Sequence, residues 1–297
     1  MKGGKAMQQI GVIGCGVMGD GIVRNLLHKN YNVHIYDTEP ARLEDLRRKG
    51  ALPAGDTAAL AAACDVIITS LPSPVIMENV IVNSVIPSAA PGAYILDMGT
   101  TDIATTKELN EHAEAAGIHF LDCPVSGGPD GAKNGTLSMM CGGREDKFKE
   151  VEPFMREMGA SIYYLGPSGS GQVVKMCNNL VVSGVITVLS EAFHTGETYG
   201  IPSSVLAEVL QSGSAATKAM DVFGGNIVAG TQDEVKFSLQ HMAKDLSFLE
   251  DFTTKERISL LAAPVIKELY DEAAAAGMGE MDSSAVSLMY KHEQQKG

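Results

Sequence analysis

The sequence predicts an α/β protein in which an N-terminal doubly wound sheet is followed by an all-α domain built on a long interdomain helix. Apolar runs of strand length alternate with helical stretches over the first half of the chain, a glycine-rich turn follows the first run, and strand-like alternation disappears after Gly171. We expect the boundary near Leu165, with domains of residues 7–165 and 166–297. Residues 1–6 precede a second Met and are left out of the fold prediction.

Seven short apolar runs are predicted to be strands because polar or glycine-rich turns bound them. They are residues 9–13, 32–36, 65–70, 94–97, 119–122, 136–141 and 161–164. Helical stretches separate most of these runs, which is typical of parallel strands joined by crossover helices. We therefore expect one sheet with helices on both faces.

The C-terminal part has the pattern of a helical domain. Residues 172–199 predict one long, largely apolar helix, and further helices are expected over 202–212, 233–254, 263–276 and 283–293. A helix that is apolar on so many sides must be buried, within its own domain or against a second subunit. We therefore expect a homodimer or homotetramer.

Composition and charge predict a soluble, cytoplasmic protein. The net charge is -13 and no basic stripe offsets it, which argues against a nucleic-acid partner. The five cysteines are scattered singly, without a Cys-x-x-Cys pair, so we expect neither a metal site nor a disulfide framework. We find neither an apolar run of about 20 residues nor the apolar core of a signal peptide, and we expect no membrane partner.

The turn after the first predicted strand has the sequence Gly14-Cys15-Gly16-Val17-Met18-Gly19. Gly14 permits the tight turn, Gly16 lets the backbone approach a pyrophosphate, and Gly19 lets the following helix pack close to the strand. The backbone N–H groups at the helix start, at Val17 and Met18, then face the anion. This is the dinucleotide fingerprint of a Rossmann-type domain in its required context.

The second predicted strand ends at Asp37, about where an acidic side chain accepts hydrogen bonds from the adenosine ribose. A carboxylate there repels a 2′-phosphate, so NAD is the expected cofactor and NADP is the alternative. Arg42 could reach such a phosphate, although its position also fits a solvated helix face.

Lys175 and Asn179 lie four residues apart on the long predicted helix and share one of its faces. Their neighbours are Val, Met, Leu and Gly, a setting in which an ammonium group is poorly solvated and its pKa is expected to fall toward working pH. Such a group can act as a general acid or base. The alternative is a lysine whose stem crosses an apolar surface to reach water.

Loops at the carboxyl ends of strands form the ligand-binding edge of an open α/β sheet. Leu71 and Pro72 follow the strand 65–70 and could wall a cofactor cleft or form a plain turn. The turn after the strand 94–97 contains the hydroxyl of Thr100. Thr101 or Asp102 is expected to cap the helix that follows this turn.

A later turn, Ser126-Gly127-Gly128, combines a hydroxyl with two residues that can expose successive backbone N–H groups. Such a nest suits a carboxylate. The alternative is that turn geometry alone requires these small residues.

Four motifs, in this order, resemble those of the β-hydroxyacid dehydrogenase family, which includes 3-hydroxyisobutyrate dehydrogenase, tartronate semialdehyde reductase and the glyoxylate or succinic semialdehyde reductases. The motifs are GVIGCGVMG, DCPVSGG, GSGQVVKMCNN and Lys244-Asp245-Leu246. The resemblance spans nearly the whole chain. It implies an NAD(P)-dependent 3-hydroxyacid dehydrogenase or semialdehyde reductase whose helical domain binds substrate and forms the dimer.

The resemblance also implies a role for each site residue. Lys175 would handle the hydroxyl proton, and Asn179 would bind the substrate and orient the lysine. The turn Ser126-Gly127-Gly128 would bind the substrate carboxylate. Thr100 would lie by the nicotinamide ribose and the substrate, and Lys244 would close over the cofactor.

At two positions the chain can be compared with particular members of the family. Asp37 matches members that prefer NAD rather than those with an Asn-Arg-Thr turn for NADP. Gly99 stands where many members have a serine, so one hydroxyl contact of those members is not expected here.

The expected reaction is hydride transfer between NAD and the alcohol or aldehyde carbon of a small 3-hydroxy acid, similar to 3-hydroxyisobutyrate, or its semialdehyde. One alternative is an NADPH-dependent reductase of semialdehydes, glyoxylate or imines. The alternative outside the enzymes is an NAD-sensing scaffold, because a fold does not fix a function. The sequence does not predict whether the substrate carries a methyl, hydroxyl, second carboxylate or sulfonate group.

Overall fold

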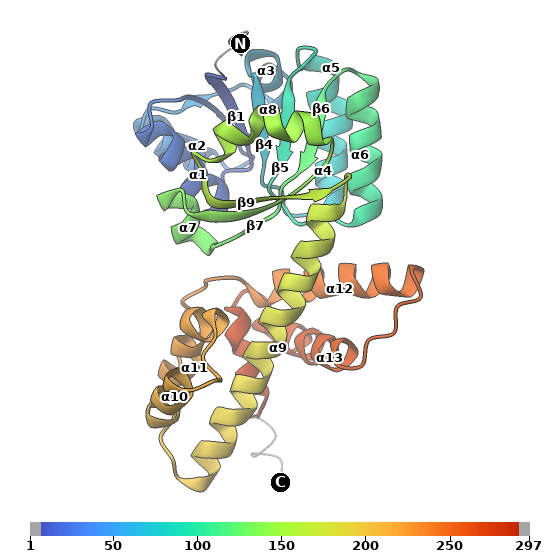
Figure 1. Cartoon of the computed structure of the whole chain (residues 1–297). Helices are drawn as coiled ribbons and strands as arrows, with labels where there is room; N and C mark the ends of the chain where they lie inside the picture. The colour runs from blue at the N-terminus through green and yellow to red at the C-terminus, as the bar shows by residue number, and fades with distance from the viewer. Residues whose placement is uncertain (1–6, 291–297) are drawn as a thin grey trace. The chain divides into compact units, whose positions relative to one another are not determined.

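The computed structural model describes residues 7–290, in which the chain forms two compact units. The first unit ends at Lys175 and the second begins at Met176. In Figure 1 the first unit runs from blue to green and the second is mostly yellow to red. Residues 1–6 and the end of the last predicted helix, 291–293, lie outside the described residues.

A single mixed sheet organises the first unit. Its strands are β1 (Gln9–Ile13), β2 (Asn32–Tyr36), β3 (Leu52–Pro53), β4 (Val66–Thr69), β5 (Tyr94–Asp97), β6 (His119–Asp122), β7 (Val125–Ser126), β8 (Leu137–Gly142) and β9 (Gly159–Gly166). The order is β3-β2-β1-β4-β5-β6-β8-β7, with β9 paired to β8. All pairs from β3 to β6 are parallel, whereas β8 runs antiparallel to β6 and β7. The predicted fold class is therefore confirmed.

Helices connect the strands, as the alternating pattern predicts. They are α1 (Val17–His28), α2 (Pro40–Arg48), α3 (Thr57–Ala63), α4 (Pro74–Val80), a π-helical turn (Ile81–Val85), α5 (Ile86–Ser88), α6 (Ile103–Ala115), α7 (Gly128–Asn134) and α8 (Glu145–Met155). The seven predicted strands are all present, four of them with the predicted bounds. The prediction missed β3 and β7, because a pair of residues is too short to show a period.

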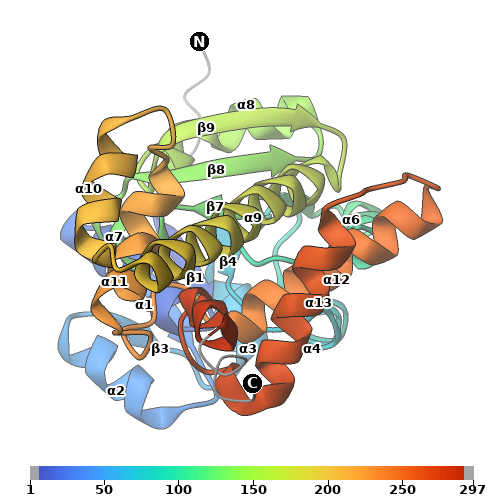
Figure 2. The same ribbon diagram turned by 90° about the horizontal axis from the view of Figure 1, so that it is seen from below.

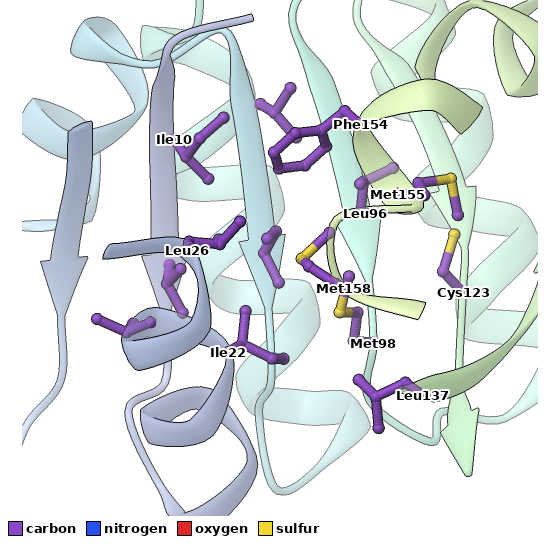
Figure 3. Close-up of a cluster of buried hydrophobic side chains, with 14 of the residues drawn as sticks. Ile10, Ile22, Leu26, Leu96, Met98, Cys123, Leu137, Phe154, Met155 and Met158 are labelled. Atoms are coloured by element: carbon purple, nitrogen blue, oxygen red, sulfur yellow. The ribbon is translucent and has the colours of Figure 1, made fainter. Parts of the chain in front are cut away.

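Both faces of the sheet are packed with apolar side chains. Along β1, Ile10 and Val12 belong to one core cluster and Ile13 to the other, as expected when successive side chains point to opposite faces. Figure 3 shows the first cluster, in which Ile22 of α1 and Phe154 of α8 lie over the strands. This packing makes the sheet a rigid base for the loops at its carboxyl edge.

The second unit is helical over the residues described. Its elements are the greater part of α9 (Ser170–Tyr199), α10 (Ser203–Ser212), a π-helical turn (Met220–Gly224), α11 (Gly225–Ala229), α12 (Leu239–Lys255), α13 (Ala263–Ala273), a second π-helical turn (Ala274–Met278) and a 3₁₀ turn (Ser283–Ser287). Its core includes Ile186 of α9, Met242 of α12 and the fully buried Tyr270 of α13. Figures 1 and 2 show α12 and α13 packed against each other.

The structure corrects two predicted helices of this unit. The helix predicted from residue 233 begins at Leu239, because the buried carboxylate of Asp282 accepts the backbone N–H groups of Lys236 at 2.8 Å and Phe237 at 3.2 Å. Ser238 then caps α12 by accepting the N–H of His241. The helix predicted from residue 283 starts as the 3₁₀ turn, and the segment 220–229 is helical although it was not predicted.

The long helix α9 also corrects the expectation about apolar runs. By length and composition alone it could span a membrane, a test that the core helix of a soluble protein passes as well. Ile186, Leu189 and Phe193 of α9 are buried in apolar clusters of the second unit. Four of the five cysteines are buried, and Cys177 on α9 is exposed.

Candidate active site

The glycine turn between β1 and α1 has the geometry of a phosphate cradle. Gly14 has φ +90°, and a Cβ atom there would lie 2.3 Å from the Ser70 carbonyl oxygen. A Cβ atom at Gly19 would lie 1.9 Å from the Gly14 carbonyl oxygen, so both positions require glycine. At Gly16 the nearest atom to such a Cβ is 3.9 Å away, which leaves room beside the start of α1. The residues present therefore fit a bound dinucleotide.

Asp37 is fixed at the end of β2 by backbone groups. Its Oδ2 atom accepts the Cys15 N–H at 2.7 Å, and its Oδ1 atom accepts the Glu39 N–H at 2.8 Å. The Arg42 guanidinium lies 3.5 Å from Oδ2 and is half exposed. Burial, together with the Asp37 charge, raises the pKa of the Cys15 thiol to about 12, so this cysteine stays a neutral thiol. The carboxylate that is expected to receive a ribose is thus held in place before any ligand binds.

The turn after β5 is organised by Asp97, which is buried. Its carboxyl group accepts hydrogen bonds from the Gly99 N–H at 3.0 Å and the Thr101 hydroxyl at 3.2 Å, and also from Thr69. Burial raises the pKa of Asp97 to about 7, against the lowering effect of these hydrogen bonds. The turn carries the half-buried Thr100.

Two details of this turn bear on the predictions. Of the two capping residues proposed for α6, Asp102 makes the cap by accepting the Thr105 N–H at 2.9 Å. A Cβ atom at Gly99 would lie 3.1 Å from the Asp97 Oδ1 atom, a tight contact. The glycine at position 99 therefore suits this local packing. Leu71 and Pro72 follow β4, and Leu71 packs beside Gly14.

The turn Ser126-Gly127-Gly128 begins on β7 and leads into α7. Ser126 is half-buried and lies opposite Ser138 of β8. Gly127 has φ +131° and Gly128 has φ +63°, conformations that side chains rarely adopt. A Cβ atom at Gly128 would meet nothing within 4 Å. The turn thus combines a hydroxyl with open backbone of the kind that binds a carboxylate.

Lys175 ends the first unit, on the second turn of α9, and is only 8% exposed. Its Nζ atom donates a hydrogen bond to the Val125 carbonyl oxygen at 2.9 Å. Val125 directly precedes the turn Ser126-Gly127-Gly128. The structure therefore places a buried lysine amine beside the turn predicted to hold the substrate carboxylate.

Two further predicted residues belong to the second unit and share a partner there. Asn179 of α9, buried, donates from Nδ2 to the Asp245 Oδ2 atom at 2.6 Å. Asn178 donates to the Asn179 Oδ1 atom at 3.0 Å, so both ends of the Asn179 amide are engaged. The Nζ atom of Lys244 lies 3.4 Å from Asp245 Oδ1 and 5.2 Å from the centre of the Phe248 ring. Asp245 of α12 thus connects two residues predicted to bind substrate and cofactor.

Sequence reasoning gave no role to the buried polar residues that hold these elements. Asp122 accepts backbone N–H groups at the start of α9, and Gln172 joins α9 to the turn after β5. The motif Lys244-Asp245-Leu246 contains Asp245 but assigns it no role. A carboxylate at the end of a predicted strand was the available signal for Asp97 and Asp122. Within residues 7–290 no three His, Cys, Asp or Glu residues gather as a metal site.

Family models match almost all of the chain. The model described as the NAD binding domain of 6-phosphogluconate dehydrogenase matches residues 9–166. The model described as NAD-binding of NADP-dependent 3-hydroxyisobutyrate dehydrogenase matches residues 169–290. The first model alone covers more than half of the chain.

Curated relatives and solved structures agree with these models. Human mitochondrial 3-hydroxyisobutyrate dehydrogenase is 31% identical, with 96% of this chain and 87% of that protein aligned. The 2-(hydroxymethyl)glutarate dehydrogenase of Eubacterium barkeri is 30% identical, with 95% of each chain aligned.

Among solved structures, Mycobacterium tuberculosis 3-hydroxyisobutyrate dehydrogenase with L-serine has a TM-score of 0.86 at 27% identity and covers 95% of this chain and 99% of that chain. Psf3 in complex with NADP+ and 2-OPP has a TM-score of 0.86 at 26% identity and covers 94% of this chain and 99% of that chain. The chain therefore belongs to the β-hydroxyacid dehydrogenase family and is an oxidoreductase with an NAD(P)-binding domain.

Proposed function

We propose that the protein oxidises the alcohol of a small 3-hydroxy acid with NAD, or reduces the matching semialdehyde, with Lys175 as the general acid/base. The observation that carries this proposal is the buried Lys175 amine, which donates a hydrogen bond at 2.9 Å to the carbonyl of Val125, next to Ser126-Gly127-Gly128. A general acid/base must lie within hydrogen-bond reach of its proton. A substrate whose carboxylate occupies the turn would place its hydroxyl group near this lysine.

The proposed mechanism assigns a task to each group of the chain. The dinucleotide, when bound at the turn 14–19, supplies the hydride chemistry. In oxidation Lys175 accepts the hydroxyl proton, and in reduction its ammonium donates a proton to the aldehyde oxygen. Ser126 and the backbone of Gly127 and Gly128 hold the carboxylate. Asn179, whose amide is oriented by Asp245, contributes a polar contact to substrate.

The proposed preference for NAD rests on Asp37. Its carboxylate is bound to two backbone N–H groups and cannot turn away, so a 2′-phosphate would meet a fixed negative charge. The family model that matches residues 169–290 is described as NADP-dependent, and Psf3 is in complex with NADP+. Arg42 is the residue of this chain that would favour NADP. An NADPH-dependent reductase is therefore the second candidate.

The test follows nicotinamide absorbance with purified protein, each dinucleotide, and a panel of 3-hydroxy acids, semialdehydes and imines without a carboxylate. We expect turnover of a carboxylated alcohol with NAD, and a fall of about 10²- to 10⁴-fold in Lys175→Ala. Lys149→Ala, which changes an exposed lysine on α8, is the matched control and should keep full turnover.

The outcomes separate the candidates. Retention of more than about a tenth of wild-type turnover by Lys175→Ala would remove this lysine from the proposed role. Faster turnover of imines with NADPH would favour the second candidate. Tight binding of NAD without turnover of any compound would favour the scaffold reading.

A further inference from the structure

Asp122 lies where the end of β6 meets the start of α9. Its carboxylate is fully buried and accepts two backbone N–H groups of that helix start, from Gly169 at 2.9 Å to Oδ1 and from Gln172 at 3.2 Å to Oδ2. N–H groups at a helix start have no partner within the helix, and the helix dipole favours a negative charge there. Asp122, at the end of β6, thus caps the start of α9.

Glycines on two sides leave the space that the Asp122 carboxylate occupies. A Cβ atom at Gly142 of β8 would lie 2.7 Å from both carboxylate oxygens. A Cβ atom at Gly171 would lie 2.8 Å from Oδ2 and 2.3 Å from the Met140 carbonyl oxygen. A side chain at either position would therefore displace the carboxylate and break its hydrogen bonds to Gly169 and Gln172, which join the start of α9 to the end of β6.

The same segment of chain also holds the ammonium group. Three residues after Asp122, the Val125 carbonyl oxygen accepts the hydrogen bond from Lys175 Nζ. Three residues before Lys175, the Gln172 N–H donates to Asp122. The segment 122–125 and the helix turn 172–175 are therefore joined at both of their ends.

A third connection ties this helix turn to the neighbouring loop. The Gln172 side chain is fully buried, accepts the Thr101 N–H at 3.2 Å and donates to the Gly99 carbonyl oxygen at 3.2 Å. The first turn of α9 is thus bonded to the loops after β5 and β6. Its register cannot change without breaking bonds to both.

We propose that Asp122 is a positioning residue for the reaction: by anchoring the first turn of α9 it sets where the Lys175 amine lies relative to the substrate turn. This inference rests on the proposed function of Lys175. Asp122 itself touches no reacting atom. A residue that acts only through Lys175 should matter for turnover only while that lysine is present.

Asp122→Asn is the variant that tests this role. Asparagine has the same shape, but its NH₂ group cannot accept an N–H, so one of the two anchoring bonds is lost. Asp282→Asn is the matched control, because Asp282 is equally buried and accepts backbone N–H groups of Lys236 and Phe237 in the second unit. Both variants lose the same kind of contact.

Amide hydrogen exchange of the full-length protein with NAD tests the anchor without any need for activity. In Asp122→Asn we expect exchange at Gly169 or Gln172, and along the first turn of α9, to become at least about tenfold faster. In Asp282→Asn the faster exchange should appear at Lys236 and Phe237 instead. Unchanged exchange at the start of α9 in Asp122→Asn would overturn the inference.

A double-mutant cycle with Lys175→Ala tests whether the anchor serves the reaction. With Lys175 present, we expect Asp122→Asn to lower kcat at least about tenfold while the Kd for NAD stays within about twofold. In the Lys175→Ala background, the same substitution should change the residual kcat less than about twofold. Asp282→Asn should change kcat by the same factor with Lys175 present and in the Lys175→Ala background. An equal loss from Asp122→Asn with and without the lysine would assign Asp122 a purely structural role.

The two arms also separate this inference from the proposed function. If Lys175→Ala retains turnover, or no panel compound reacts, the proposed function and this role of Asp122 fail together. If turnover depends on Lys175 but the cycle shows no coupling, only the role of Asp122 fails.

Discussion

Buried carboxyl groups end two neighbouring strands of the sheet, and the first of them makes stability depend on pH. Burial raises the pKa of Asp97 to about 7, whereas an unfolded aspartate has a pKa of about 3.9. Between these values the folded protein binds more protons, so the contribution of Asp97 to stability is greatest at low pH and is lost as the pH rises toward 7.

Asp97→Asn removes this titration while keeping the shape of the side chain. We expect the free energy of unfolding of the variant, relative to wild type, to rise by on the order of 2 kcal/mol between pH 5 and pH 8. Denaturant titrations at several pH values measure it. Parallel curves for wild type and Asp97→Asn would contradict this account.

A second prediction at the residue scale concerns cofactor choice. Asp37→Asn keeps an acceptor for a backbone N–H and removes the charge that would repel a 2′-phosphate, while Arg42 remains nearby. We expect the ratio of kcat/KM for NAD to that for NADP to fall at least about tenfold. Adding Arg42→Ala should reverse most of the gain with NADP. A ratio unchanged by Asp37→Asn would mean that other residues choose the cofactor.

Sequence reasoning reached these residues unevenly, for a physical reason. Gly14, Gly19 and Asp37 were predicted because their roles depend on local turn geometry and on a fixed spacing along the chain. The roles of Asp122 and Gln172 depend on partners about 50 to 70 positions away. No local pattern contains that information.

At the scale of elements, the same distinction holds. The strands β1, β2, β5 and β6 were predicted with their observed bounds, because each is a short run with buried apolar residues, alternating in β2, that turns close at both ends. The start of α12 was wrong, because the side chain of Asp282 takes backbone N–H groups that a helix would otherwise have used. The start of α12 is therefore set by tertiary hydrogen bonds, which local helical propensity does not predict.

A prediction for an element concerns the first turn of α9. In Gly171→Ala the new Cβ atom would overlap the Met140 carbonyl oxygen, at 2.3 Å, so the helix start must move. We expect a loss of at least about 2 kcal/mol in the free energy of unfolding. Gly225→Ala in α11 is the control, because a Cβ atom there meets nothing within 4 Å. It should be neutral or stabilising by up to about 1 kcal/mol.

Calorimetry of wild type and both glycine variants measures these effects. The order of the three proteins by stability should be the same with and without NAD. A Gly171→Ala protein as stable as wild type would show that the start of α9 can relax. Such a result would also weaken the case that Asp122 holds this turn in one position.

At the scale of the whole molecule, the exposed apolar side chains of the second unit bear on assembly. On α9, Val181 and Val188 are 65% and 58% exposed and lie seven residues apart, which places them on one face of the helix. On α10, Val205 and Val209 are also exposed. Apolar faces of this kind usually meet a partner, and we expect it to be a second copy of this chain.

The corresponding prediction is that a charged face on α9 separates the copies. We expect wild type to have two or four times the monomer mass in sedimentation equilibrium, and Val181→Asp with Val188→Asp to shift it toward the monomer, because burying two carboxylates in an apolar interface is costly. Leu52→Asp, at an exposed apolar position in the first unit, should leave the mass unchanged. An unchanged mass in the α9 variant would place the interface elsewhere, and a monomeric wild type would refute the expected oligomer.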